Sequence, residues 1–154
     1  MIDPKQFREL VIGPTLLAIQ LHTQAAENLL LGTALVESGL RHLRQLGGGP
    51  ARGLYQMEPA THDDHWRNFL IGRDELRVNI EGLMFAAMPA LEQLVINLGY
   101  ATAMCRIHYL RVWRQLPEAD DVRALAAYWK QWYNTPAGKG NESRFVELYL
   151  AHAS

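Results

Sequence analysis

The feature that most constrains the fold is a helical spacing of apolar residues, clearest in the segment 24–38. Its apolar and small side chains recur three or four residues apart up to Glu37, at Ala26, Leu29, Leu30, Thr33 and Ala34. This spacing places them on one face of an amphipathic helix, and Thr23 can cap its free amides. We therefore expect a helix over 24–38, with Glu37 on or beside its buried face.

The same spacing predicts helices along most of the chain. Asp3-Pro4 is typical of a helix start, and this first helix should break at Gly13-Pro14, because proline lacks a hydrogen-bond donor. Thr61 and Asp64 form a capping-box pattern for a helix through Leu70. Further helices are expected over 89–113, bent at Gly99, over 117–129 from a start at Pro117 with Asp120, and through Phe145, Leu148 and Tyr149 after the segment 138–141.

The segment 47–58 is expected to be non-helical. Its first part, Gly47-Gly48-Gly49-Pro50 up to Gly53, predicts a loop, because glycine is costly to order and proline removes a donor. The following Leu54–Glu58 is closed by Pro59 and is too short for a helix, so we expect a short extended piece or hairpin strand. Extended backbone would point Leu54, Gln56 and Glu58 to one face and Tyr55 and Met57 to the other.

Length and composition favour a single domain. A chain of 154 residues with 49% hydrophobic residues can bury one core without disulfides or metal, and it contains no internal repeat. We expect one mainly α domain over 1–154, with six or seven helices around one core and a small extended element or β-hairpin.

Charge and residue types exclude several functions. The 15 basic and 16 acidic side chains are interspersed, so nucleic acid is not an expected partner. The triple glycine lacks the lysine and serine of a phosphate loop. His62 and His65 fit a charged first helical turn better than a metal site, and the lone Cys105 is expected to be a buried apolar residue rather than a nucleophile. We therefore expect no cofactor.

Two further features bear on location and on sugar binding. Met1–Arg8 carries charges of both signs, and Leu16–Leu21 is too short and too interrupted for a secretory core or a membrane span. We expect a protein made in the cytosol without a signal peptide. Trp66, Trp113, Trp129 and Trp132 are expected mainly in the core, with sugar stacking as the alternative.

An ordered set of short motifs resembles a known superfamily. Glu37-Ser38 is followed by the glycine loop, then by Gly53-Leu54-Tyr55-Gln56-Met57-Glu58-Pro59-Ala60-Thr61, and later by Leu125–Tyr128 and Tyr133–Gly138. This set, spread over most of 31–140, is similar to the soluble lytic transglycosylases and goose-type lysozymes. The resemblance implies a lysozyme-like fold and cleavage of the bond between N-acetylmuramic acid and N-acetylglucosamine in peptidoglycan.

The resemblance also implies roles for individual residues. Glu37 would be the catalytic acid, and Glu58 would position a water in a hydrolase, whereas a transglycosylase needs no second carboxylate. The residues implied to bind substrate are Ser38, Tyr55, Gln56, Tyr133 and Asn134. Either Tyr128 or Tyr133 would correspond to the tyrosine of the family's last motif.

The residues of these motifs are also similar to those of phage virion-associated cell-wall hydrolases. This implies a virion component that acts in the periplasm or cell wall, with peptidoglycan strands and other virion proteins as partners. The alternative is a catalytically silent lysozyme-like protein that serves as a structural or wall-binding part of a virus particle.

Overall fold

The computed structural model describes residues 1–153 and is mainly helical, as predicted. These residues form eight continuous helical stretches, somewhat more than the six or seven expected, and three of the stretches contain π-helical turns. The elements are α1 (Pro4–Phe7), η1 (Arg8–Ile12), α2 (Gly13–Ala18), α3 (Gln24–Ser38), α4 (Pro59–Asp64), η2 (His65–Leu70), α5 (Asp74–Glu81), α6 (Ala90–Ile96), α7 (Leu98–Leu110), α8 (Val122–Trp129), η3 (Lys130–Asn134) and α9 (Glu142–His152).

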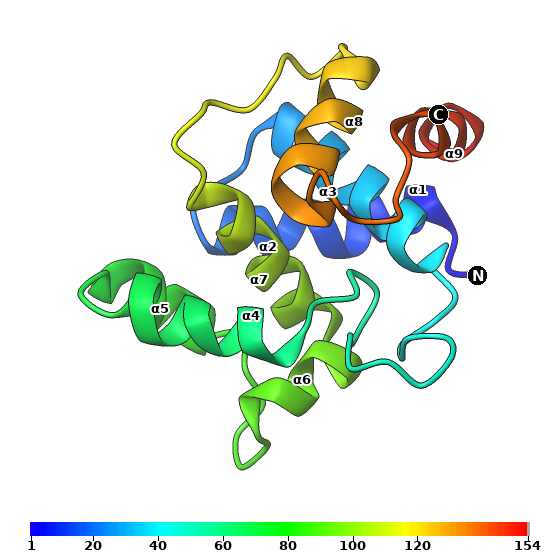
Figure 1. Ribbon diagram of the computed structural model, residues 1–154. Helices are drawn as coiled ribbons and strands as arrows, with labels where there is room; N and C mark the ends of the chain where they lie inside the picture. Colours follow the sequence, from blue (N-terminus) through cyan, green and yellow to red (C-terminus); the bar gives the residue numbers. More distant parts are fainter. Residues whose placement is uncertain (154) are drawn as a thin grey trace.

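Helix α7 forms the centre of the molecule. Nearly all of its residues from Tyr100 to Tyr109 are buried, and it contacts α2, α3, α6 and all three π-helical segments. Figure 1 shows α3, α8 and α9 grouped on one side of α7 and α4, α5 and α6 on the other. The loop between α3 and α4 and the end of η3 therefore lie where the two groups meet.

Helix α3 has the predicted bounds. The Thr23 hydroxyl accepts a hydrogen bond from the Ala26 amide at 3.0 Å, as expected of a cap. The helix ends because Gly39 adopts a left-handed conformation, with φ of 61°. Glu37 thus lies in the last turn of an otherwise buried helix.

The predicted break at Gly13-Pro14 is wrong. The helix continues from Pro4 to Ala18, and the five residues before Gly13 form the π-helical turn η1. The Gly13 amide donates to the carbonyl of Arg8, five residues earlier. A wider turn ahead of Pro14 accommodates its missing donor and its ring, so the proline lies in the first turn of α2 rather than ending the helix.

The predicted helix over 89–113 is two helices. The break lies at Asn97, whose backbone is extended (φ −119°, ψ 96°) and whose side chain accepts from the Tyr100 amide to cap α7. Gly99 lies inside α7 and is not the bend. Asparagine competes with the backbone for hydrogen bonds, which explains why the chain changes direction there.

Other helix starts are displaced by two to five residues from the predicted ones. Helix α4 begins at Pro59, so Thr61 lies inside it and is not a cap. Helix α8 begins after Asp121, which accepts from the Ala124 amide, rather than at Pro117. Helix α5 was not predicted, whereas α9 follows its segment as expected, capped by Asn141.

The segment 51–58 is a tight hairpin rather than an extended strand. Arg52 and Met57 exchange both backbone hydrogen bonds, so the four residues between them form the turn. Gly53 and Gln56 adopt positive φ values of 76° and 48°, which removes the alternation of faces expected of a strand. A Cβ at Gly53 would overlap the carbonyl oxygen of Leu94, so the turn packs directly on α6.

Candidate active site

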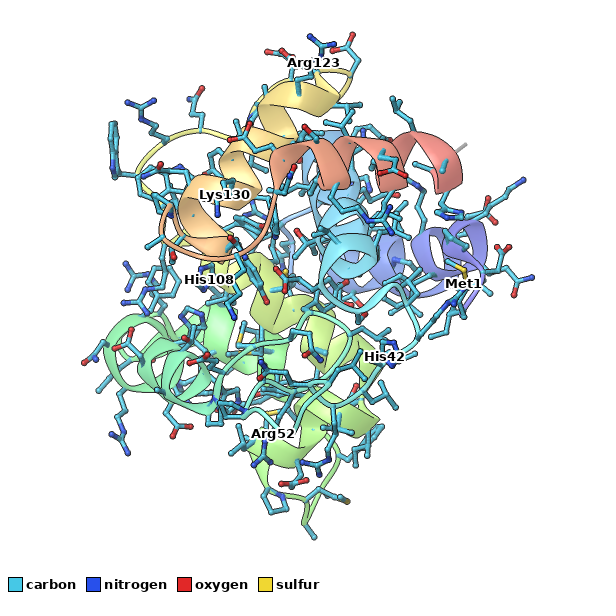
Figure 2. All side chains as sticks on the ribbon, turned by 45° about the vertical axis from the view of Figure 1, so that its right-hand side comes forward. Met1, His42, Arg52, His108, Arg123 and Lys130 are labelled. Atoms are coloured by element: carbon cyan, nitrogen blue, oxygen red, sulfur yellow. The ribbon has the colours of Figure 1, made fainter. Side chains whose placement is uncertain are left out.

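An open cleft of about 690 Å³ lies where the two groups of helices meet. Figure 2 shows two of its lining residues, His42 and His108, on opposite sides of the centre of the molecule. The volume is typical of a ligand site. The full lining consists of Glu37, His42, Gln45, Leu46, Ala51, Gln56, Met57, Glu58, Thr61, His108, Tyr133, Asn134, Thr135 and Lys139.

Glu37 is the half-buried carboxylate of this cleft. Burial raises its pKa from 4.5 to about 7, and a hydrogen bond from Trp129 partly opposes that rise. Its place in the last turn of α3 also puts it near the negative end of the helix dipole, which disfavours a second negative charge. Near neutral pH the group therefore exists in both protonation states, as a general acid and base must.

Trp129 holds one oxygen of Glu37. Its indole nitrogen donates to Oε1 of Glu37 over 2.9 Å. Because an indole N–H can only donate, Oε1 is the acceptor, and Oε2 is left to carry the acid proton of neutral Glu37. Trp129 itself is almost fully buried and packs on the ring of Phe145, with centroids 5.7 Å apart, so the donor is fixed in place.

Gln56 and Glu58 line the same cleft as Glu37. The Gln56 side chain donates to the carbonyl of Gly53 at 2.9 Å, which fixes the side chain beside its own turn and leaves its oxygen as an acceptor. Glu58 is exposed at the start of α4 and makes no side-chain capping bond. A buried and an exposed carboxylate therefore share one cleft.

Tyr133 and Asn134 come from η3, at the end of α8. The Tyr133 hydroxyl donates to the carbonyl of Tyr55 at 2.6 Å, and burial raises the pKa of this phenol well above its usual value. Asn134 accepts from Lys130 at 2.8 Å and from the Gly140 amide at 3.2 Å. Both residues line the cleft while they also tie together the loops that form its wall.

The structure separates the two candidate tyrosines of the last motif. The Tyr128 hydroxyl donates to the carbonyl of Arg114 at 2.9 Å, and Tyr128 is not among the cleft-lining residues. Tyr133 is the one of the two that lines the cleft.

Ser38 and Tyr55, two of the residues expected to bind substrate, do not line the cleft. Both are buried. The Ser38 hydroxyl is 2.7 Å from the carbonyl of Leu54 and 3.1 Å from that of Ala34, and the Tyr55 hydroxyl is 3.0 Å from Oγ1 of Thr102. These contacts join the hairpin to α3 and α7, so both residues support the cleft wall from behind rather than facing a ligand.

The sequence predicted no contact between Trp129 and Glu37, and it indicated no site role for His42 or His108. Trp129 was expected in the core, and it is there, but its nitrogen reaches Glu37. A signal was present, because Trp129 precedes Tyr133 by four residues, and such residues share one helix face. The positions of His42 and His108 depend on contacts between distant segments, so the local sequence gives no comparable signal.

Two further features of residues 1–153 concern metal ions and membranes. Within this range, no group of three or more His, Cys, Asp or Glu side chains is arranged to hold a metal ion. His62 instead lies 2.7 Å from the Tyr100 hydroxyl, and His65 lies 3.1 Å from His108. None of the helices described here combines the length and the apolar character that crossing a membrane requires.

Comparisons with protein-family models, with curated proteins and with solved structures found no match to this chain. We therefore infer function from the motifs and from the geometry of the cleft.

Proposed function

We propose that this chain cleaves the glycosidic bond between N-acetylmuramic acid and N-acetylglucosamine of bacterial peptidoglycan, with Glu37 as the acid. The observation that carries the proposal is the position of Glu37, a half-buried carboxylate in an open cleft that Gln56 also lines, and this burial raises its pKa to about 7. Glycosidic cleavage requires a carboxylic acid that is still protonated near neutral pH.

In the first step, protonated Glu37 gives its proton to the glycosidic oxygen as the bond from that oxygen to the sugar's anomeric carbon breaks. Oε2 is the oxygen that carries the proton, because Trp129 occupies Oε1. The anomeric carbon becomes electron-poor, and Glu37, now a carboxylate, retains the Trp129 hydrogen bond that stabilises its charge.

Two second steps are compatible with the residues of the cleft. In the transglycosylase route, the Glu37 carboxylate removes the proton of the muramic acid C6 hydroxyl, whose oxygen attacks the anomeric carbon and leaves an anhydro end. In the hydrolase route, Glu58 removes a proton from the attacking water. The exposure of Glu58 at the cleft gives it access to water, and the burial of Glu37 suits either route.

We propose that the chain is a component of a virus particle. It would act in the periplasm or cell wall and open the wall locally. The motif resemblance to virion-associated hydrolases supports this setting. The rival function is a silent lysozyme-like wall-binding or structural protein, which would not need a carboxylate with a raised pKa. The cleft and the half-buried Glu37 favour the enzyme.

The test is release of soluble fragments from purified bacterial sacculi. We expect the wild-type protein to release fragments and Glu37→Gln to release none, because glutamine keeps the shape and cannot donate the proton. Glu118→Gln is the matched control, since Glu118 is exposed and lies outside the cleft. Equal release by wild type and Glu37→Gln would reject Glu37 as the acid, and no release by folded wild type would favour the silent protein.

Glu58→Gln separates the two routes. If the Glu58→Gln protein releases no fragments, as we expect of Glu37→Gln, the result would indicate the hydrolase route, in which Glu58 activates water. Full release by Glu58→Gln would indicate the transglycosylase route, in which Glu37 acts as acid and then as base.

A further inference from the structure

A second groove of about 510 Å³ adjoins the cleft on the far side of Thr61 and His108, which line both. It lies between α4, the end of α7 and η3. Its other lining residues are Ala60, Asp64, His65, Arg111, Val112, Trp113 and Trp132. The two shared residues place the groove next to the cleft, so one extended ligand could reach from one to the other.

The ionisable groups of this groove are paired with one another, by an ion pair or by hydrogen bonds. Arg111 pairs with Asp64 at 2.6 Å and also donates to Nδ1 of His65 at 2.9 Å. His108 donates from Nε2 to the carbonyl of Trp132 at 2.7 Å, because a carbonyl can only accept. Its Nδ1 is then the acceptor for His65, 3.1 Å away.

This chain of hydrogen bonds requires both histidines to be neutral. Burial lowers the pKa of His65 to about 3 and also lowers that of His108. Because the charges of Arg111 and Asp64 cancel, the groove presents polar groups without a net charge. Such a lining suits an uncharged polar ligand and offers no free charge to an acidic or basic one.

Two tryptophans give the groove an aromatic surface. Trp113 is 77% exposed, which is unusual for so large an apolar residue, and Trp132 is half-buried. Arg114 stacks on Trp113 at 4.8 Å from the ring and is not among the groove-lining residues, so it steadies the indole without filling the groove. Sugar rings have an apolar C–H face that packs on indole and hydroxyls that bond to polar neighbours.

We propose that this groove binds further sugar residues of a glycan strand whose scissile bond lies at Glu37. The proposal rests on the proposed function, because it assigns the same strand to the cleft and the groove. Trp113 and Trp132 provide the stacking surface, and Asp64 and Arg111 provide hydrogen bonds to hydroxyl groups. The protein should therefore bind long strands more tightly than short ones.

The test measures binding of peptide-free glycan strands of two lengths, tetrasaccharides and octasaccharides, to the uncleaving Glu37→Gln protein. We expect octasaccharides to bind more tightly, and Trp113→Ala to weaken their binding about tenfold, as loss of one stacking contact implies. Tetrasaccharide binding should not change. Phe85→Ala is the matched control, because Phe85 is 50% exposed and lies outside both the cleft and the groove.

The other outcomes overturn the proposal in distinguishable ways. If Trp113→Ala leaves octasaccharide binding unchanged, the groove is not a sugar site, while the function of the cleft still stands. If octasaccharides that carry peptide stems are measured in parallel and Trp113→Ala weakens only those, the groove holds peptide rather than sugar. If neither strand binds to the folded protein, the groove proposal and the proposed function both fail.

Discussion

Replacing Glu37 with glutamine should make the fold less sensitive to pH. In the native state the pKa of Glu37 is raised from 4.5 to about 7 by burial. The folded protein therefore holds a proton that the unfolded chain has lost between these two values. Stability should fall as pH rises through this window, and glutamine, which has no charge to bury, should not show that fall.

The magnitude follows from the two pKa values. A rise from 4.5 to about 7 corresponds to a ceiling of about 3 kcal/mol lost above pH 7. Because Glu37 borders an open cleft, solvent screening reduces this, and we expect about 1–2 kcal/mol. The glutamine carbonyl can still accept the Trp129 hydrogen bond, so the substitution removes the charge with little change in packing.

The assay is urea denaturation followed by circular dichroism at about pH 4.5 and about pH 8, one on each side of the window. Glu37→Gln should gain stability relative to wild type at the higher pH and little at the lower one. Glu118→Gln serves as the control, because Glu118 is exposed. Identical pH dependence in wild type and Glu37→Gln would refute the reasoning, since Glu37 would then ionise at its ordinary pKa in the fold.

Two further substitutions test the contacts that hold the site, namely the Trp129 hydrogen bond to Glu37 and the packing of the hairpin on α6. Trp129→Phe removes a hydrogen bond that favours the Glu37 carboxylate, so the pKa of Glu37 and the high-pH limb of the cleavage rate should rise by about one unit; a slower rate with an unshifted limb would mean that Trp129 only packs. Gly53→Ala adds a Cβ that overlaps a carbonyl of α6 at positive φ and should cost about 3 kcal/mol in urea denaturation. Gly48→Ala, also at positive φ but with open space around it, should cost about 1 kcal/mol, and equal losses would contradict packing of the hairpin on α6.

The sequence was sufficient for features that depend on neighbouring residues. Helix α3 has its predicted bounds because Thr23 supplies the cap and Gly39 ends the helix by a left-handed turn. The apolar spacing then fixes Glu37 beside the buried face. The candidate acid was therefore predictable as a residue, although its raised pKa depends on the burial that the whole fold provides.

Features set by contacts between distant segments were not predictable. The hydrogen bond from Trp129 to Glu37 joins residues 92 positions apart. The positive φ of Gln56 arises where the hairpin packs on α6, and a strand pattern in the local sequence could not reveal it. The helix through Pro14 is likewise maintained by a π-helical turn that no propensity predicts.

The most direct test of the central claim is mass spectrometry of the fragments that the protein releases from purified sacculi. We predict that wild type releases strands that end in muramic acid, with an anhydro or a reducing end, and that Glu37→Gln releases none. Fragments cut in the peptide stems, strands with N-acetylglucosamine at the reducing end, or the same muramic acid ends from Glu37→Gln would contradict it.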